Sequence, residues 1–203
     1  MSEPDVTLTD YALALLCTYV VWHLYRNFIE DREDWPWLTF FGSVGLASLL
    51  GGTVHGFFPE AESLGHRILW PLTLLSIGVT ASSGWLLMQL GKWGRVLAAL
   101  SFATHFVVVL FVAQSFLVVL LNYAPPMLLW LILSLVRYLK QRSPDHLWIF
   151  AGLCISFVAA AVQALKVPIH PIYFNHNALY HVVQAAGLWT LFIGARLSLW
   201  RPR

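Results

Sequence analysis

The sequence contains few charged residues. Asp, Glu, Lys and Arg make up 11% of its 203 residues, whereas hydrophobic residues make up 59% and the mean hydropathy is +0.70. Soluble globular domains carry about 25% charged residues, so this composition excludes a water-soluble domain. The net charge is only +2 and no segment carries a basic stripe, which argues against nucleic acid as a partner.

Cysteines, a basic N-terminus and compact metal motifs are also scarce or missing. The two cysteines, Cys17 and Cys154, lie inside apolar runs, and we predict that they form no disulfide. The first five residues are acidic where a cleavable signal peptide would be basic, so none is expected. No HExxH-like pair of histidines occurs, so any metal site must draw its ligands from distant segments.

The charges that are present fall between long apolar runs. About 20 apolar residues are needed to cross the ~30 Å hydrocarbon core of a bilayer. We therefore predict an all-α integral membrane protein, a single seven-helix bundle over residues 1–203, with an acidic tail at 1–9 and a basic tail at 200–203. The expected spans are 10–28, 35–58, 65–90, 93–113, 116–139, 145–165 and 175–199.

The fourth and fifth spans are hard to separate, because the sequence from Trp93 to Leu139 is almost continuously apolar. A six-span alternative would join these two pieces. We also expect Pro125 and Pro126 to kink or interrupt the fifth span, since proline removes a helix hydrogen bond and clashes with the preceding turn.

The distribution of Lys and Arg predicts the orientation. All but two of the twelve, Arg67 and Lys166, flank one side of the seven spans. The positive-inside rule then places the N-terminus outside and the C-terminus in the cytoplasm. The residues on the basic side are Arg26, Arg32, Lys92, Arg95, Arg137, Lys140, Arg142, Arg196, Arg201 and Arg203.

Four of the eight histidines gather at the outer ends of three spans. His55 ends the second span, His66 begins the third, and His176 and His181 begin the seventh. The others are His23, His105, His146 and His170. His105 lies in the middle of the fourth span, where we expect a hydrogen-bonded interior histidine.

Polar residues are concentrated at the start of the seventh span. Asn177, His181 and Gln184 are spaced by one helical turn each and share a face. Polar side chains in hydrocarbon cost several kcal/mol (about 2–7) unless they meet a cavity, a partner or a metal. We therefore predict a functional site around His181, with Asn177 and Gln184 as hydrogen-bonding supports.

The second span carries a ridge of small residues that ends at His55. Gly42, Gly45, Ser48 and Gly52 precede it at helical spacing. Such ridges let a neighbouring helix approach closely. We expect a tightly packed neighbour beside His55, with Ser48 as a supporting group.

Clustered histidines favour zinc. A catalytic zinc site usually has three protein ligands and an open position for water, and zinc lowers the pKa of that water to about 7. His55 and His181, with His176 or His66, could supply three nitrogens.

In this pattern the chain resembles the CREST superfamily, which includes alkaline ceramidases and the adiponectin and progestin receptors. The family pattern is SxxxH in the second span, an acidic residue near the third, and HxxxH in the seventh, with three histidines on zinc and the Ser and Asp on its water. His55 and His181 match two of the histidines. Gly51 stands in place of the Ser, His66 in place of the Asp, and Asn177 in place of the first seventh-span His, beside His176.

The resemblance implies a zinc-dependent hydrolase that cleaves an amide or ester in a membrane lipid. The expected zinc ligands are His55, His176 and His181, with His66 as catalytic base or as a further ligand that would close the site. The expected location is the bacterial inner membrane, with the site near the periplasmic face. Ceramidases hold calcium near the N-terminus, where this chain carries Glu3, Asp5 and Asp10. These three residues do not match the calcium ligands well, and we expect them to form a solvated tail.

Other classes of function remain open. The same scaffold could be a non-enzymatic receptor or binding protein with a structural zinc ion. Two of the histidines could instead bind haem iron. An ion or proton carrier lacks support, because no Asp, Glu or Lys falls in the middle of an expected span. Glu60 and Glu62 could act as acid or base from the loop after His55, although solvated loop carboxylates are the simpler interpretation.

Overall fold

The computed structural model describes residues 1–29, 31, 34–170 and 173–200, and these residues form seven α-helices. All seven are long and apolar enough to cross a membrane. They are α1 (Pro4–Asn27), α2 (Trp35–Phe57), α3 (Leu64–Leu87), α4 (Lys92–Phe111), α5 (Phe116–Gln141), α6 (Pro144–Ala164) and α7 (His176–Leu199). The protein is an all-α, multi-pass membrane protein with seven helices, as predicted, and the six-span alternative is wrong.

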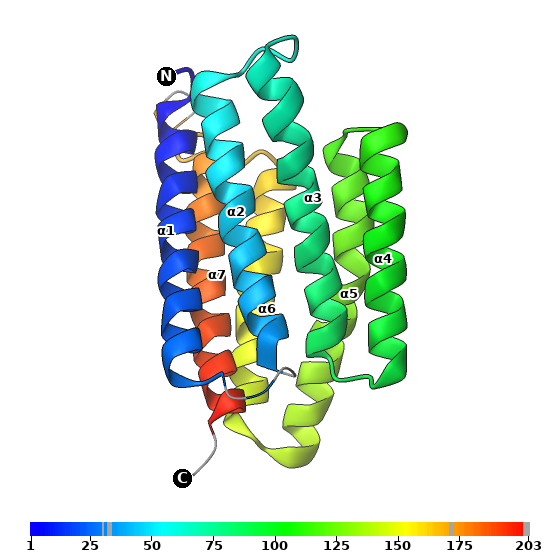
Figure 1. The fold of residues 1–203 in the computed structure, drawn as a ribbon. Coiled ribbons are helices and arrows are strands. Elements are labelled where there is room, and N and C mark those ends of the chain that lie inside the picture. The colour runs from blue at the N-terminus through cyan, green and yellow to red at the C-terminus, as the bar shows by residue number, and fades with distance from the viewer. Residues whose placement is uncertain (30, 32–33, 171–172, 201–203) are drawn as a thin grey trace.

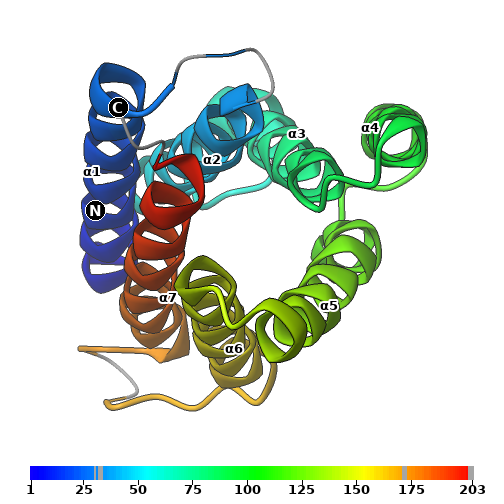
Figure 2. The same ribbon diagram turned by 90° about the horizontal axis from the view of Figure 1, so that it is seen from below.

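The helices form one bundle with the two termini at opposite ends (Figure 1). Seen along the bundle, α1, α2, α3, α5, α6 and α7 follow one another in a closed circuit, and α4 lies outside it (Figure 2). The circuit closes because α1 packs on α7 as well as on α2. The first residues of the chain therefore lie beside the polar start of α7.

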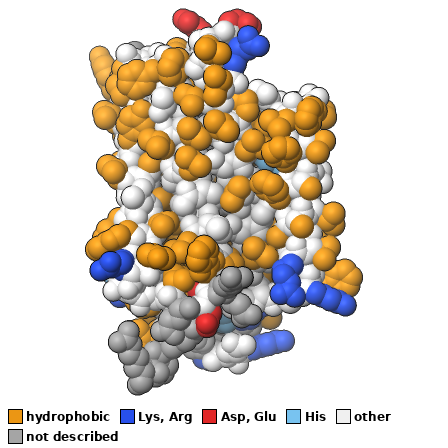
Figure 3. Space-filling model, viewed as in Figure 1, with side chains coloured by type: hydrophobic (Ala, Val, Ile, Leu, Met, Phe, Trp, Pro, Cys, Tyr) orange, Lys and Arg blue, Asp and Glu red, His pale blue; other side chains and the backbone are white. Residues whose placement is uncertain are grey.

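Charge and apolar surface are separated along the bundle. Hydrophobic side chains cover the middle of the face seen in Figure 3, and charged side chains gather at its two ends. Arg26 and Arg196 end α1 and α7, and Lys92 begins α4, at the end of the bundle that carries the C-terminus. Arg32, Arg201 and Arg203, which also entered the orientation argument, lie outside the described residues.

The N-terminal segment differs from the prediction. Helix α1 begins at Pro4, so residues 4–9 of the tail expected to be solvated are helical instead. Proline suits the first position of a helix, where its missing N–H has no partner to lose. Asp5 in the first turn suits the positive end of the helix dipole.

Pro125 and Pro126 do not interrupt the fifth span, because α5 continues through both of them. Membrane helices tolerate proline where neighbouring helices compensate for the freed backbone groups. Here α5 packs between α3 and α6. Gly84 of α3 leaves room for Met127, whose Cε would lie only 2.4 Å from a Cβ at that position.

Three glycines of α2 bring α1 into close contact. A Cβ at Gly45 would lie 2.8 Å from Cβ of Cys17, and one at Gly52 would lie 2.7 Å from Cβ of Asp10. A Cβ at Gly56 would lie 2.7 Å from Oγ1 of Thr7. Carbon atoms in contact are ~3.5–4.0 Å apart, so no larger residue fits these positions. The predicted ridge is confirmed at Gly45 and Gly52.

The largest apolar core occupies the half of the bundle nearer the C-terminus. Trp37, Phe40 and Phe41 begin α2 and pack there against Trp130 of α5. Leu188, Leu191 and Phe192 of α7 join the same cluster. The opposite half of the bundle contains the polar side chains described below.

We predict that Gly52→Val destabilises the protein by about 1–3 kcal/mol, because the new side chain overlaps Asp10 and Tyr11. Gly42→Ala is the matched control, since the nearest atom to its new Cβ is Val21 Cγ2 at 3.9 Å. Reversible denaturation in detergent micelles measures both. Equal losses for the two variants would contradict this account of the helix contact.

A buried histidine–carboxylate site at the N-terminal end of the bundle

The start of α7 is set by Asn175, which caps the helix. Its side-chain oxygen accepts hydrogen bonds from the backbone N–H groups of Asn177 (2.9 Å) and Ala178 (3.1 Å). Its own backbone N–H donates to Oδ2 of Asp5 at 3.0 Å, which ties the first turn of α1 to the first turn of α7. This register turns His181, five residues into the helix, toward the bundle interior.

His181 contacts two consecutive residues of α1. Its Nδ1 lies 3.1 Å from Oγ1 of Thr9, and its Nε2 lies 3.2 Å from Oδ1 of Asp10. His181 is 9% exposed and Asp10 is 5% exposed, so water does not screen the pair. The hydroxyl of Ser48 on α2 lies near the carboxyl group of Asp10.

The proton positions on His181 follow from the Thr9 hydroxyl. A hydroxyl has one hydrogen, and that of Thr9 is donated within its own helix, to the carbonyls of Asp5 (2.8 Å) and Val6 (3.0 Å). With this hydrogen donated there, the hydroxyl oxygen accepts from His181, and on this basis we assign the ring hydrogen to Nδ1. The lone pair of Nε2 then faces the carboxylate of Asp10. Two buried acceptors at 3.2 Å repel each other unless a proton or a metal cation lies between them.

A second histidine–carboxylate pair lies at the same end of the bundle. Nδ1 of His55 on α2 lies 2.7 Å from Oε2 of Glu3, at the N-terminal boundary of α1. Both side chains are partly exposed, at 33% and 42%. This Glu3 oxygen is itself buried, and His55 is the partner that it faces. His55 is also close enough to act electrostatically on His181.

The other residues predicted for the site lie elsewhere. His66 contacts the backbone carbonyl of Phe58 through Nδ1 at 3.0 Å, and so closes the turn between α2 and α3. His176 is the first residue of α7, and its side chain makes no hydrogen bond or ion pair with the described residues. Gln184 donates to Oγ of Ser156 at 3.3 Å and links α7 to α6. Asn177 contributes its backbone N–H to the helix cap.

Three expectations outside the site are confirmed. His105 is a buried interior histidine whose Nε2 lies 2.9 Å from the carbonyl oxygen of Leu74. Glu60 and Glu62 are exposed loop carboxylates. Cys17 and Cys154 are free.

The sequence interpretation missed the residues from α1. Glu3, Asp5, Thr9 and Asp10 all contact His55 or the start of α7, and all were assigned to a solvated tail or its border. A signal for this helix was present, because proline followed by an acidic residue is typical of a helix start.

The donor atoms form two pairs and no closed ligand set. Among residues 1–29, 31, 34–170 and 173–200, no three His, Cys, Asp or Glu side chains are grouped closely enough to hold a metal ion. Of the histidines expected to meet on zinc, His55 contacts Glu3, and His181 contacts Thr9 and Asp10, so they do not share one site.

Comparison with known proteins places the chain in a family. Residues 6–199 match the model of a family of unknown function, DUF6962. The chain belongs to this family. No curated protein and no solved structure matches it. Membership of DUF6962 assigns no activity, so the buried site provides the evidence about function.

We predict that Thr9→Val destabilises the fold by about 1–3 kcal/mol, because it leaves the Nδ1–H of His181 buried without an acceptor. Thr18→Val is the matched control, since the Thr18 hydroxyl donates only to the Ala14 carbonyl of its own helix. Denaturation in detergent compares the two. A loss no greater for Thr9→Val than for Thr18→Val would refute the proton assignment.

Proposed function

We propose that the protein is a zinc-dependent membrane hydrolase that cleaves an amide or ester bond in a lipid. The observation that supports this function most is the buried contact between Nε2 of His181 and Oδ1 of Asp10, two acceptors that need a proton or a metal cation between them. The second pair, His55 with Glu3, adds an imidazole and a carboxylate at the same end of the bundle.

The chemistry of these donors fits zinc. Imidazole nitrogen and carboxylate oxygen are both common zinc ligands. Zinc-binding histidines usually donate their other ring N–H to a neighbouring oxygen, as His181 does to Thr9. We therefore propose His181, Asp10 and His55 as the ligands, with Asp10 in the place first predicted for His176. Because the described donors stand as two pairs, zinc binding would draw the pairs together.

Bound zinc would polarise the scissile carbonyl of the substrate and would lower the pKa of its bound water to about 7. Side chains of the protein would orient the ligands and transfer the proton. The Ser48 hydroxyl, which lies near the Asp10 carboxyl, would orient it. Glu3 carries a carboxylate beside His55 and would accept the proton of the attacking water. It thus takes the role first predicted for His66, which the Phe58 carbonyl holds in the loop.

The substrate is proposed to be a lipid with an acyl group, because the site lies near the ends of helices that cross a bilayer. With the orientation expected from the Lys and Arg distribution, this end faces the periplasm of a bacterial inner membrane.

A structural role for the site is the alternative, and burial favours it. Asp10 and His181 are 5% and 9% exposed, which leaves little access for a substrate. In that case the protein would be a non-enzymatic receptor or binding protein, in which a zinc ion holds α1, α2 and α7 together.

We predict that purified protein contains stoichiometric zinc by elemental analysis. His181→Ala and Asp10→Ala are expected to lose most of it, because each removes a ligand. His66→Ala and His176→Ala serve as controls and should retain it. Zinc-free wild-type protein would disprove the metal hypothesis, and equal zinc in all four variants would disprove the ligand set.

We predict that Glu3→Gln lowers hydrolysis of N-acyl and O-acyl lipids by about 10²–10⁴-fold, because the amide cannot accept a proton. Its zinc content and unfolding midpoint should stay at the wild-type values. Glu60→Gln, an exposed loop carboxylate, is the control and should be fully active. If no lipid in the panel is hydrolysed by zinc-loaded wild-type protein, the structural alternative replaces the enzyme.

A further inference from the structure

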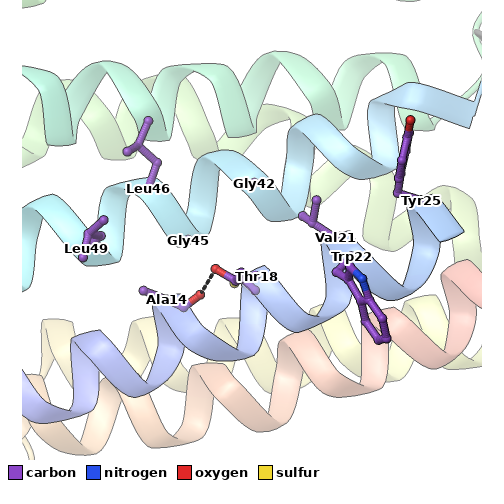
Figure 4. A pocket seen from close by; sticks show the side chains of 10 residues that line it. Ala14, Thr18, Val21, Trp22, Tyr25, Gly42, Gly45, Leu46 and Leu49 are labelled. Atoms are coloured by element: carbon purple, nitrogen blue, oxygen red, sulfur yellow. Dashed lines mark hydrogen bonds between the residues drawn. The ribbon is translucent and has the colours of Figure 1, made fainter.

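An apolar groove of about 420 Å³ runs between α1 and α2 on the outside of the bundle (Figure 4). Its walls include Ala14, Thr18 and Val21 of α1 and Gly42, Leu46 and Leu49 of α2. The groove forms where the close contact between the two helices ends. Gly45 touches Cys17, but one turn nearer the start of α2, at Gly42, the nearest atom to an added Cβ is 3.9 Å away.

The groove offers no hydrogen bond to an occupant along most of its length. Thr18 carries a hydroxyl there, and it donates to the Ala14 carbonyl at 2.8 Å, as the dashed line in Figure 4 shows. The groove also lies along two membrane-spanning helices, where the surrounding molecules are lipids. An alkyl chain therefore fits both the lining and the surroundings.

Besides Thr18, the polar groups of the groove lie at the end nearer the C-terminus of α1. Trp22 and Tyr25 line this end and are 58% and 60% exposed. Trp and Tyr are enriched at the level of lipid headgroups. Arg26 is exposed in the last turn of α1, one helical turn beyond Trp22 on the same face. A guanidinium group is well suited to bind phosphate.

We propose that this groove is a binding site for a membrane phospholipid, with one acyl chain between α1 and α2 and the phosphate at Arg26. The acyl chain covers the apolar surface that α1 and α2 leave open on the Gly42 side of Gly45. The headgroup lies at the aromatic end, where Tyr25 and Trp22 flank it. This site is separate from the histidine–carboxylate pairs, and it does not depend on the proposed hydrolase activity.

The test uses Gly42→Leu, which fills the groove, and Arg26→Gln, which removes the phosphate ligand. Gly42 has room for a side chain, so the variant should fold. Arg95→Gln, an exposed arginine at the start of α4, is the matched control. Delipidated protein in detergent is titrated with phosphatidylglycerol, phosphatidylethanolamine or diacylglycerol, and the unfolding midpoint and the lipid retained in native mass spectrometry are recorded.

Both phospholipids should stabilise wild type and Arg95→Gln. Each of these proteins should retain one phospholipid molecule in native mass spectrometry. Gly42→Leu should lose retention of every lipid, and Arg26→Gln should lose the preference for phospholipid over diacylglycerol. Equal retention by wild type and Gly42→Leu would overturn the assignment of the groove. A wild-type response to diacylglycerol equal to that for phospholipid would overturn the role of Arg26.

Discussion

The close packing of α1 on α2 is the constraint on which the rest of the structure depends. It exists because Gly45, Gly52 and Gly56 present no side chain to α1. At Gly52 the atom pressed against the backbone is Cβ of Asp10 itself. The carboxyl group is thereby held between α2 and α7, away from water, and within reach of both Ser48 and His181. One steric feature thus positions the most buried acidic group in the described residues.

Burial in a membrane bundle makes each polar contact energetically significant. A buried polar group without a partner costs about 1–3 kcal/mol, and a charge costs more. Most polar groups at this end have a protein partner: the Asn175 backbone has Asp5, and the His181 Nδ1–H has Thr9. His181 and Asp10 instead face each other through two acceptor atoms that need a proton or a metal cation between them, and this sets the pair apart from His105, whose Nε2 meets a backbone carbonyl.

About half of the candidate site could be predicted. His55 and His181 were expected there, because histidines at the ends of apolar spans are unusual and the depth of each follows from its place in the span. Thr9, Asp10 and Glu3 were missed, because α1 begins earlier than its apolar run and because α1 and α7 are neighbours only in the folded chain. His66 and His176 share the depth of the site but do not join it, since depth does not determine which way a helix face points.

The sequence by itself determined the seven helices, their approximate ends and the ridge of small residues on α2. Each of these depends on a local requirement: hydrocarbon imposes length and apolarity on every span separately, and close helix contact requires small residues on one ridge. The tertiary structure decided the order of the helices around the bundle and the rotation of each about its axis. Those depend on how side chains far apart in sequence pack together, and this packing, which joins Asp10 to His181, is recorded in no single segment of the chain.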